Sequence, residues 1–154
     1  MSNRIKAQRA INNFKVRSRG LLRNVDLMDK LWRCVLKPRI LYGQEIIVYD
    51  KEWIRWLESA QHQVGCKILG TRTLTNRTGV RLELGWKSIE GEIMAAKIRY
   101  LGKIQSMEEH RLPKIILREM LGSTNPVGWT KEINKIKDDL QVPENFNELK
   151  KVVY

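Results

Sequence analysis

The side chains best suited to catalysis in this sequence are its carboxylates, and their spacing does not favour an active site. Phosphoryl-transfer chemistry with two metal ions needs several carboxylates that converge on one place. The acidic residues here are scattered, and the only adjacent aspartates are Asp138 and Asp139. Neighbours on a helix point about 100° apart, so this pair cannot chelate one ion together. A Gly-rich phosphate loop and a Ser or Cys nucleophile setting are also missing, so we expect no catalytic residues.

A second possible chemistry is zinc binding. His62 and Cys66 stand four residues apart, and Cys34 and His110 could complete a set of four ligands. Cysteine is, however, among the most often buried residue types, and Cys66 lies beside the apolar face of its predicted helix. We therefore expect Cys66 in the core, with no metal and no cofactor. Two cysteines in a chain without a signal peptide favour a reducing, intracellular compartment.

The strongest functional signal is the charge. The net charge is +12, and residues 1–39 hold eleven Lys and Arg against two acids, a net of +9. Seven of those eleven are Arg, which suits bidentate phosphate contacts. A field this concentrated attracts polyanions, which indicates nucleic acid. A membrane surface or a solvated basic face are the alternatives, although no apolar run approaches the roughly 18 residues of a membrane span.

Residues 3–23 are predicted to form the helix that carries this charge. Its apolar face consists of Ala7, Ala10, Ile11, Phe14, Leu21 and Leu22. The remaining surface carries our candidate phosphate-binding residues, which are Arg9, Lys15, Arg17, Arg19 and Arg23. Residues 3–23 contain no Asp or Glu, so nothing within this helix can pair with these cations.

Helical periodicity and helix-stop residues continue along the chain. Asp26 is expected to cap a helix that runs to about Leu41, and Pro38 to kink or break it. Asp50 is expected to cap the next helix, whose apolar face is Trp53, Leu57, Ala60, Val64 and Ile68 and which stops at Gly70. A short helix up to Leu84 stops at Gly85. A long helix opens at Ser88 with Ile89, Ile93, Ala96, Tyr100, Ile104 and Met107 inside. Further helices are predicted at 112–121, 129–140 and 144–152.

The predicted fold class is therefore all-α, an irregular helical bundle of about six to eight helices with no substantial sheet. Trp53 lies on an apolar stripe and is expected in the core. Trp86 and Trp129 each follow a glycine and are expected to pack between helices. Trp56 lies off the stripe, so it could either join the core or stack on nucleic-acid bases.

Four short motifs resemble one family in order and spacing. Lys37–Glu45 resembles the Pro-x-x-Leu-Tyr-Gly-x-Glu motif that follows the palm in reverse transcriptases of non-LTR retrotransposons. Leu57–Gln61 resembles the family's Leu-Glu-x-x-Gln, Lys67–Gly70 its Arg/Lys-x-Leu-Gly, and Glu83–Trp86 its Glu-Leu-Gly-Trp. The matching positions include Pro38, Tyr42, Gly43, Glu45, Leu57, Glu58, Gln61, Gly70, Gly85 and Trp86. One departure is Ile47, where the family usually has Trp.

The resemblance implies that residues 1–121 form a thumb-like helical domain and residues 122–154 a helical extension packed on it. It implies that the thumb holds RNA or DNA, as a primer–template duplex, by its phosphates without reading sequence. It further implies a polymerase palm and fingers as partners and a nuclear location. The palm's Tyr-x-Asp-Asp motif is absent from this sequence, so no activity is expected of the chain alone. The alternative is an independent helical nucleic-acid-binding or protein-interaction module derived from such an element.

Overall fold

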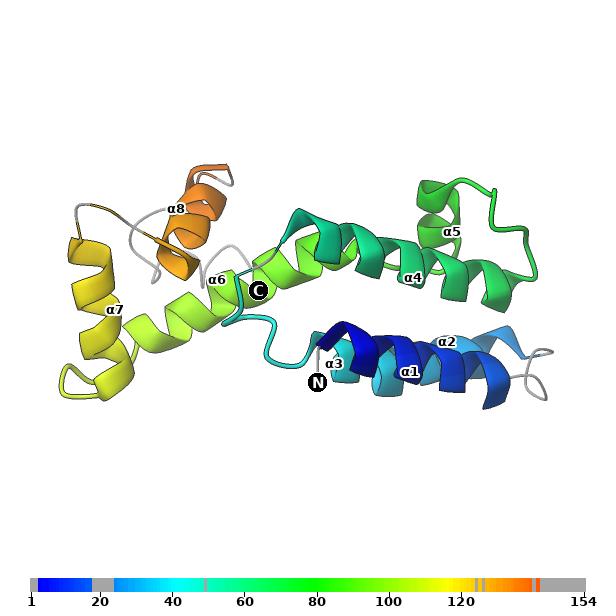
Figure 1. Ribbon diagram of the computed structural model, residues 1–154, viewed down its shortest axis with the longest axis horizontal. Coiled ribbons are helices and arrows are strands. Elements are labelled where there is room, and N and C mark those ends of the chain that lie inside the picture. Colours follow the sequence, from blue (N-terminus) through cyan, green and yellow to red (C-terminus); the bar gives the residue numbers. More distant parts are fainter. Residues whose placement is uncertain are drawn as a thin grey trace. The chain divides into compact units, whose positions relative to one another are not determined.

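The computed structural model describes residues 3–17, 24–48, 50–123, 125, 127–139 and 141. These residues form helices and connecting turns, without a strand among them, which confirms the predicted all-α class (Figure 1). The elements are α1 (Asn3–Arg17), α2 (Val25–Leu31), η2 (Trp32–Leu36, a π-helix), α3 (Lys37–Leu41), α4 (Lys51–Leu69), α5 (Arg77–Glu83), α6 (Ile89–Gln105), α7 (Leu112–Gly122) and α8 (Trp129–Asp139). The predicted helix at residues 144–152 lies outside the described residues.

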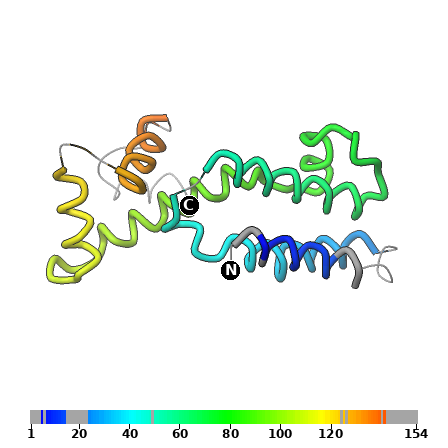
Figure 2. The backbone as a smooth tube through the Cα atoms, in the orientation of Figure 1, coloured from blue at the N-terminus to red at the C-terminus, as the bar shows by residue number. Residues whose placement is uncertain are grey.

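The chain divides into two compact units. Unit 1 consists of residues 1–43 and 49–92, and unit 2 of residues 44–48 and 93–154. In the backbone trace, the blue-to-green helices α1 to α5 belong to unit 1 and the yellow and orange helices α7 and α8 to unit 2, while most of α6 belongs to unit 2 (Figure 2). The boundary expected between residues 121 and 122 rests on the family resemblance and stays a prediction.

Unit 1 is built around apolar stripes from three helical segments. α1 buries Ala7, Ile11 and Phe14, as its periodicity predicts, whereas Ala10 is only half-buried. The segment α2–η2–α3 buries Met28, Trp32, Leu36 and Ile40, and α4 buries Leu57, Ala60, Val64 and Ile68. α4 packs closely on α5 at Gly65, where an added Cβ would lie 2.6 Å from Cγ1 of Val80.

The segment from Val25 to Leu41 corrects two expectations. Its N-terminal cap is Asn24, whose side chain accepts a hydrogen bond from the Leu27 N–H, whereas Asp26 lies in the first turn. Pro38 does not break the helix, because it lies in the first turn of α3 directly after the π-helical turn. The N–H of Lys37 bonds five residues back, to the Trp32 carbonyl. Pro38, which has no N–H, therefore stands where the hydrogen-bonding register changes.

The predicted helix ends of unit 1 are largely confirmed. Asp50 caps α4 by accepting from the Glu52 N–H, and Gly70 ends it in the left-handed conformation with φ +66°. Asn76 caps α5. The Ser88 hydroxyl accepts from the Gly91 N–H at the start of α6. Gly43 also has a positive φ, +75°, with open space around it, so backbone conformation rather than close packing favours glycine there.

Unit 2 has a smaller core of Leu101, Ile104, Leu117 and Ile133, with Tyr100 and Trp129 packed against it. The buried face of α6 follows Ile89, Ile93, Lys97, Leu101 and Ile104. The predicted inner face is therefore wrong at Ala96 and Met107, which are only half-buried, whereas Tyr100 is half-buried but packs against the core as expected. The reason is that Lys97 is buried despite its charge, so a pattern drawn from apolar residues alone misplaces the stripe by one residue.

Candidate nucleic-acid interface

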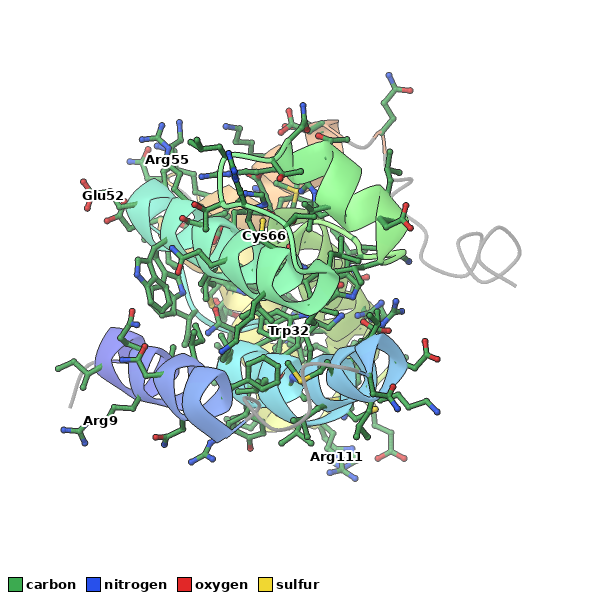
Figure 3. The ribbon with its side chains drawn as sticks, turned by 90° about the vertical axis from the view of Figure 1, so that its right-hand side faces the viewer. Arg9, Trp32, Glu52, Arg55, Cys66 and Arg111 are labelled. Carbon is green, nitrogen blue, oxygen red and sulfur yellow. The ribbon has the colours of Figure 1, made fainter. Side chains whose placement is uncertain are left out.

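Three of the five predicted phosphate-binding residues, Arg9, Lys15 and Arg17, belong to α1. The structure describes the side chain of Arg9 alone among the five. Arg9 is exposed on α1 and extends away from the helix (Figure 3). Lys15 and Arg17 belong to α1, but the structure does not describe their side chains. Arg19 and Arg23 lie outside the described residues. Because α1 directs Ala7, Ile11 and Phe14 into the core, Arg9 is left on its remaining surface.

Two tryptophans of α4 lie near Arg9. Trp53 and Trp56 stack with ring centroids 5.1 Å apart and planes 9° from parallel. Both are half-buried, which corrects the expectation that Trp53 belongs to the core; its ring is engaged by Trp56 at the helix surface. Trp56 lines an open pocket of about 320 Å³ together with Ile5, Gln8 and Arg9 of α1. Glu52 and Arg55 extend from the same part of α4 (Figure 3).

Two of the motif residues on α4 make long-range contacts within unit 1. The Glu58 carboxylate accepts a hydrogen bond from the Glu90 N–H at 3.2 Å, at the start of α6, and pairs with Arg81 of α5 at 3.3 Å. The Gln61 amide donates to the Lys87 carbonyl at 3.1 Å. Leu57, in the same motif, is buried in the core. These residues therefore hold α4, α5 and the start of α6 together.

Trp86 performs a similar structural role. It is buried and stacks on Trp32, with centroids 5.3 Å apart, and its indole N–H donates to the Asp29 carboxylate at 2.6 Å. Asp29 also pairs with Arg33 at 2.8 Å, and the Arg33 guanidinium donates to the Leu84 carbonyl. Sequence reasoning missed Asp29 and Arg33, although their spacing of four residues is the signal of a helical ion pair.

The remaining motif positions lie in turns and helix ends. Tyr42 is exposed, with 88% of its surface accessible, and thus contributes no core packing. Glu45 belongs to unit 2, where its carbonyl accepts a hydrogen bond from the Trp129 indole at 2.7 Å. Gly85 has φ +61° and ends the turn after α5. Glu45 and Gly85 thus contribute to the fold through a backbone carbonyl and a left-handed turn.

His62 and Cys66 are buried, as expected for a core position at Cys66. The Cys66 sulfur lies 3.5 Å from Nε2 of His62, which is 3.0 Å from the Thr73 carbonyl oxygen. Cys34 is exposed on η2. Among the described residues, no three His, Cys, Asp or Glu side chains are grouped closely enough to hold a metal ion.

The carboxylates serve local structure in several places. Lys37 pairs with Glu92 at 2.9 Å, and Lys114 with Glu109 at 2.7 Å. The Lys114 hydrogen bond lowers the pKa of the Glu109 carboxyl. Lys97 pairs with Glu132 inside unit 2. A carboxylate that is neutralised by one cation in this way is a poor member of a two-metal centre.

Unit 2 also contains an apolar groove of about 340 Å³ between α6, α7 and Trp129. Its lining includes Ile104, Leu112, Ile116 and Met120. These side chains offer no cation to a phosphate, so the groove does not extend the basic surface. In the part of the chain that the structure describes, none of the helices combines the length and the apolar character needed to cross a membrane.

Compared with protein-family models, curated proteins and solved structures, the chain matches none of them. Its function must therefore be argued from its residues and their geometry, with the motif resemblance as an additional support.

Proposed function

We propose that this chain binds nucleic acid as a thumb-like module related to the reverse transcriptases of non-LTR retrotransposons. It grips a primer–template duplex through phosphate contacts and is not catalytic alone. The observation that carries the proposal is α1, which contains five basic residues and no acidic one while its apolar residues fill the core of unit 1. Cations gathered on one helix repel each other, and a polyanion relieves that repulsion.

The motif residues support the same proposal from a second direction. Glu58 and Gln61 belong to one motif and Trp86 to another. The first two contact Glu90 and Lys87, which follow the Glu83–Trp86 motif. Trp86 contacts Asp29 and Trp32, which precede the Lys37–Glu45 motif. A shared scaffold is a physical reason for these motifs to occur together at fixed spacing. The proposal includes a nuclear location and, if the chain is part of a longer protein, a palm and fingers as its partners.

The experiment is binding to a DNA–RNA hybrid duplex at several salt concentrations. If about five phosphates are neutralised, the logarithm of the affinity should fall with the logarithm of the salt concentration at a slope of roughly −4. Arg9→Gln should reduce the size of that slope by about 1, and similarly on every duplex sequence. It should leave the melting temperature nearly unchanged, because Arg9 is exposed.

The matched control is Arg99→Gln, which removes one exposed arginine from α6 and should leave the slope unchanged. A folded parent that binds no duplex at low salt would refute nucleic-acid binding and favour the alternative of a protein-interaction module. A reading frame encoding a palm directly upstream would favour the thumb over an independent binding protein.

A further inference from the structure

The tryptophans of unit 1 fall into two stacked pairs with different surroundings. Trp32 and Trp86 are buried, and the Trp86 N–H is bonded to Asp29, so this pair belongs to the scaffold. Trp53 and Trp56 are also stacked, with nearly parallel planes, but both remain partly accessible on α4. An accessible, ordered pair of indole rings on a folded helix offers a flat apolar surface to a ligand.

The neighbours of this second pair belong to the basic helix. Ile5, Gln8 and Arg9 of α1 line an open pocket with Trp56, and its volume of about 320 Å³ is at the small end of the range for ligand sites. A pocket of that size suits one planar group better than a folded segment. Arg9 is exposed at its edge and brings a permanent positive charge beside the aromatic ring.

From this geometry we infer a binding site for one unpaired nucleobase, which stacks at Trp56 while its backbone phosphate meets Arg9. The inference deepens the proposed function and rests on it. Inside a duplex both faces of a base are covered by neighbouring bases, so an internal paired base cannot present a face to an indole ring, whereas an unpaired nucleotide can. Stacking on an aromatic side chain is tolerant of sequence, which agrees with a module that holds nucleic acid by its backbone.

The test compares a blunt DNA–RNA hybrid with the same hybrid extended by a short single-stranded overhang, at each end in turn. One stacked base should raise the affinity of the full chain by about 5- to 100-fold over the blunt hybrid. Trp56→Ala should remove that gain and leave binding of the blunt hybrid unchanged, whereas Trp56→Phe should keep most of it. Tyr42→Ala, which truncates another exposed aromatic of unit 1, should keep the whole gain.

A second measurement uses the unmodified protein and is independent of how the variants fold. Overhangs carrying 5-iodouracil are irradiated in the complex, and the crosslinked peptide is identified by mass spectrometry. The site requires crosslinks at Trp56 or its stacking partner Trp53. The inference is overturned if the overhang adds no affinity, if Trp56→Ala weakens both hybrids equally, or if the crosslinks lie elsewhere. If the unmodified protein still binds the blunt hybrid in those cases, the proposed function stands without the base-stacking site. If the unmodified protein does not bind the blunt hybrid at all, both the proposed function and the site are refuted.

Discussion

Lys97 and Arg9 are both cations on helices, and burial gives them opposite roles. The Lys97 side chain has no exposed surface, and its ammonium group is paired with Glu132 of α8. Burial lowers the pKa of Lys97, and the hydrogen bond and charge of Glu132 oppose that shift. Arg9 is exposed beside an aromatic pocket. Lys97 is therefore a structural charge of unit 2, whereas Arg9 is a surface charge of unit 1.

The lowered pKa of Lys97 predicts a pH dependence of stability. At pH values between the pKa of Lys97 in the folded chain and its ordinary value of 10.5, Lys97 is protonated more often in the unfolded chain than in the folded chain. The contribution of Lys97 to the free energy of unfolding should thus rise with pH across that window. The Lys97→Met variant lacks this contribution. The free energy of unfolding of the unmodified protein minus that of the variant should therefore increase as the pH approaches 10.5.

Urea unfolding of the two proteins at a series of pH values from neutrality upward measures that difference. Lys135→Met, at an exposed position of α8, is the control and should give a difference that does not change with pH. A Lys97 difference that is equally flat would contradict burial of this ammonium group.

At the scale of elements, glycines with left-handed backbone end several helices and turns. Gly70 ends α4 with φ +66°, and an added Cβ there meets nothing within 4 Å. Gly79 lies within α5, and it too has open space at the Cβ position. The two positions thus differ in backbone conformation and not in packing.

This contrast predicts opposite signs for the same substitution. Gly70→Ala should destabilise the protein by about 1–2 kcal/mol, because a left-handed conformation strains a residue with a Cβ. Gly79→Ala should stabilise it by about 0.5–1 kcal/mol, because alanine favours a helix interior. Thermal or urea unfolding of both variants checks the pair. Stabilisation by Gly70→Ala would contradict the left-handed end of α4, and destabilisation by Gly79→Ala would contradict a helical, unobstructed position in α5.

Sequence patterns predicted those elements that depend on local chemistry. The caps at Asp50 and Ser88, the stop at Gly70 and the buried stripe of α1 follow from propensity and periodicity. Propensity and periodicity did not predict the π-helical turn before Pro38 or the burial of Lys97. Each of these depends on the hydrogen-bonding register or on contacts with residues distant in the sequence. For the candidate site, the basic helix could be read from composition, but its neighbour Trp56 required the packing of α1 against α4.

At the scale of the whole molecule, the positive charge is concentrated and the negative charge is dispersed. The net charge of +12 is supplied mainly by residues 1–39. Several of the carboxylates that the structure describes cap helices or pair with cations, as Asp50, Glu58 and Glu92 do. Such a concentration of positive charge supports the proposed binding of a polyanion.

The last prediction is that the purified chain neither extends a primer nor cleaves nucleic acid with Mg²⁺ or Mn²⁺. Two-metal catalysis places ions about 3.5–4 Å apart, which requires carboxylates that share one site. In the described residues no such group of three ligands exists, and Asp138 and Asp139 are neighbours on one helix that point in different directions. Primer-extension and nuclease assays with labelled hybrid duplexes measure this directly. Extension or cleavage that a single acid-to-amide substitution abolishes would reveal a metal centre and move the chain from a binding module to an enzyme.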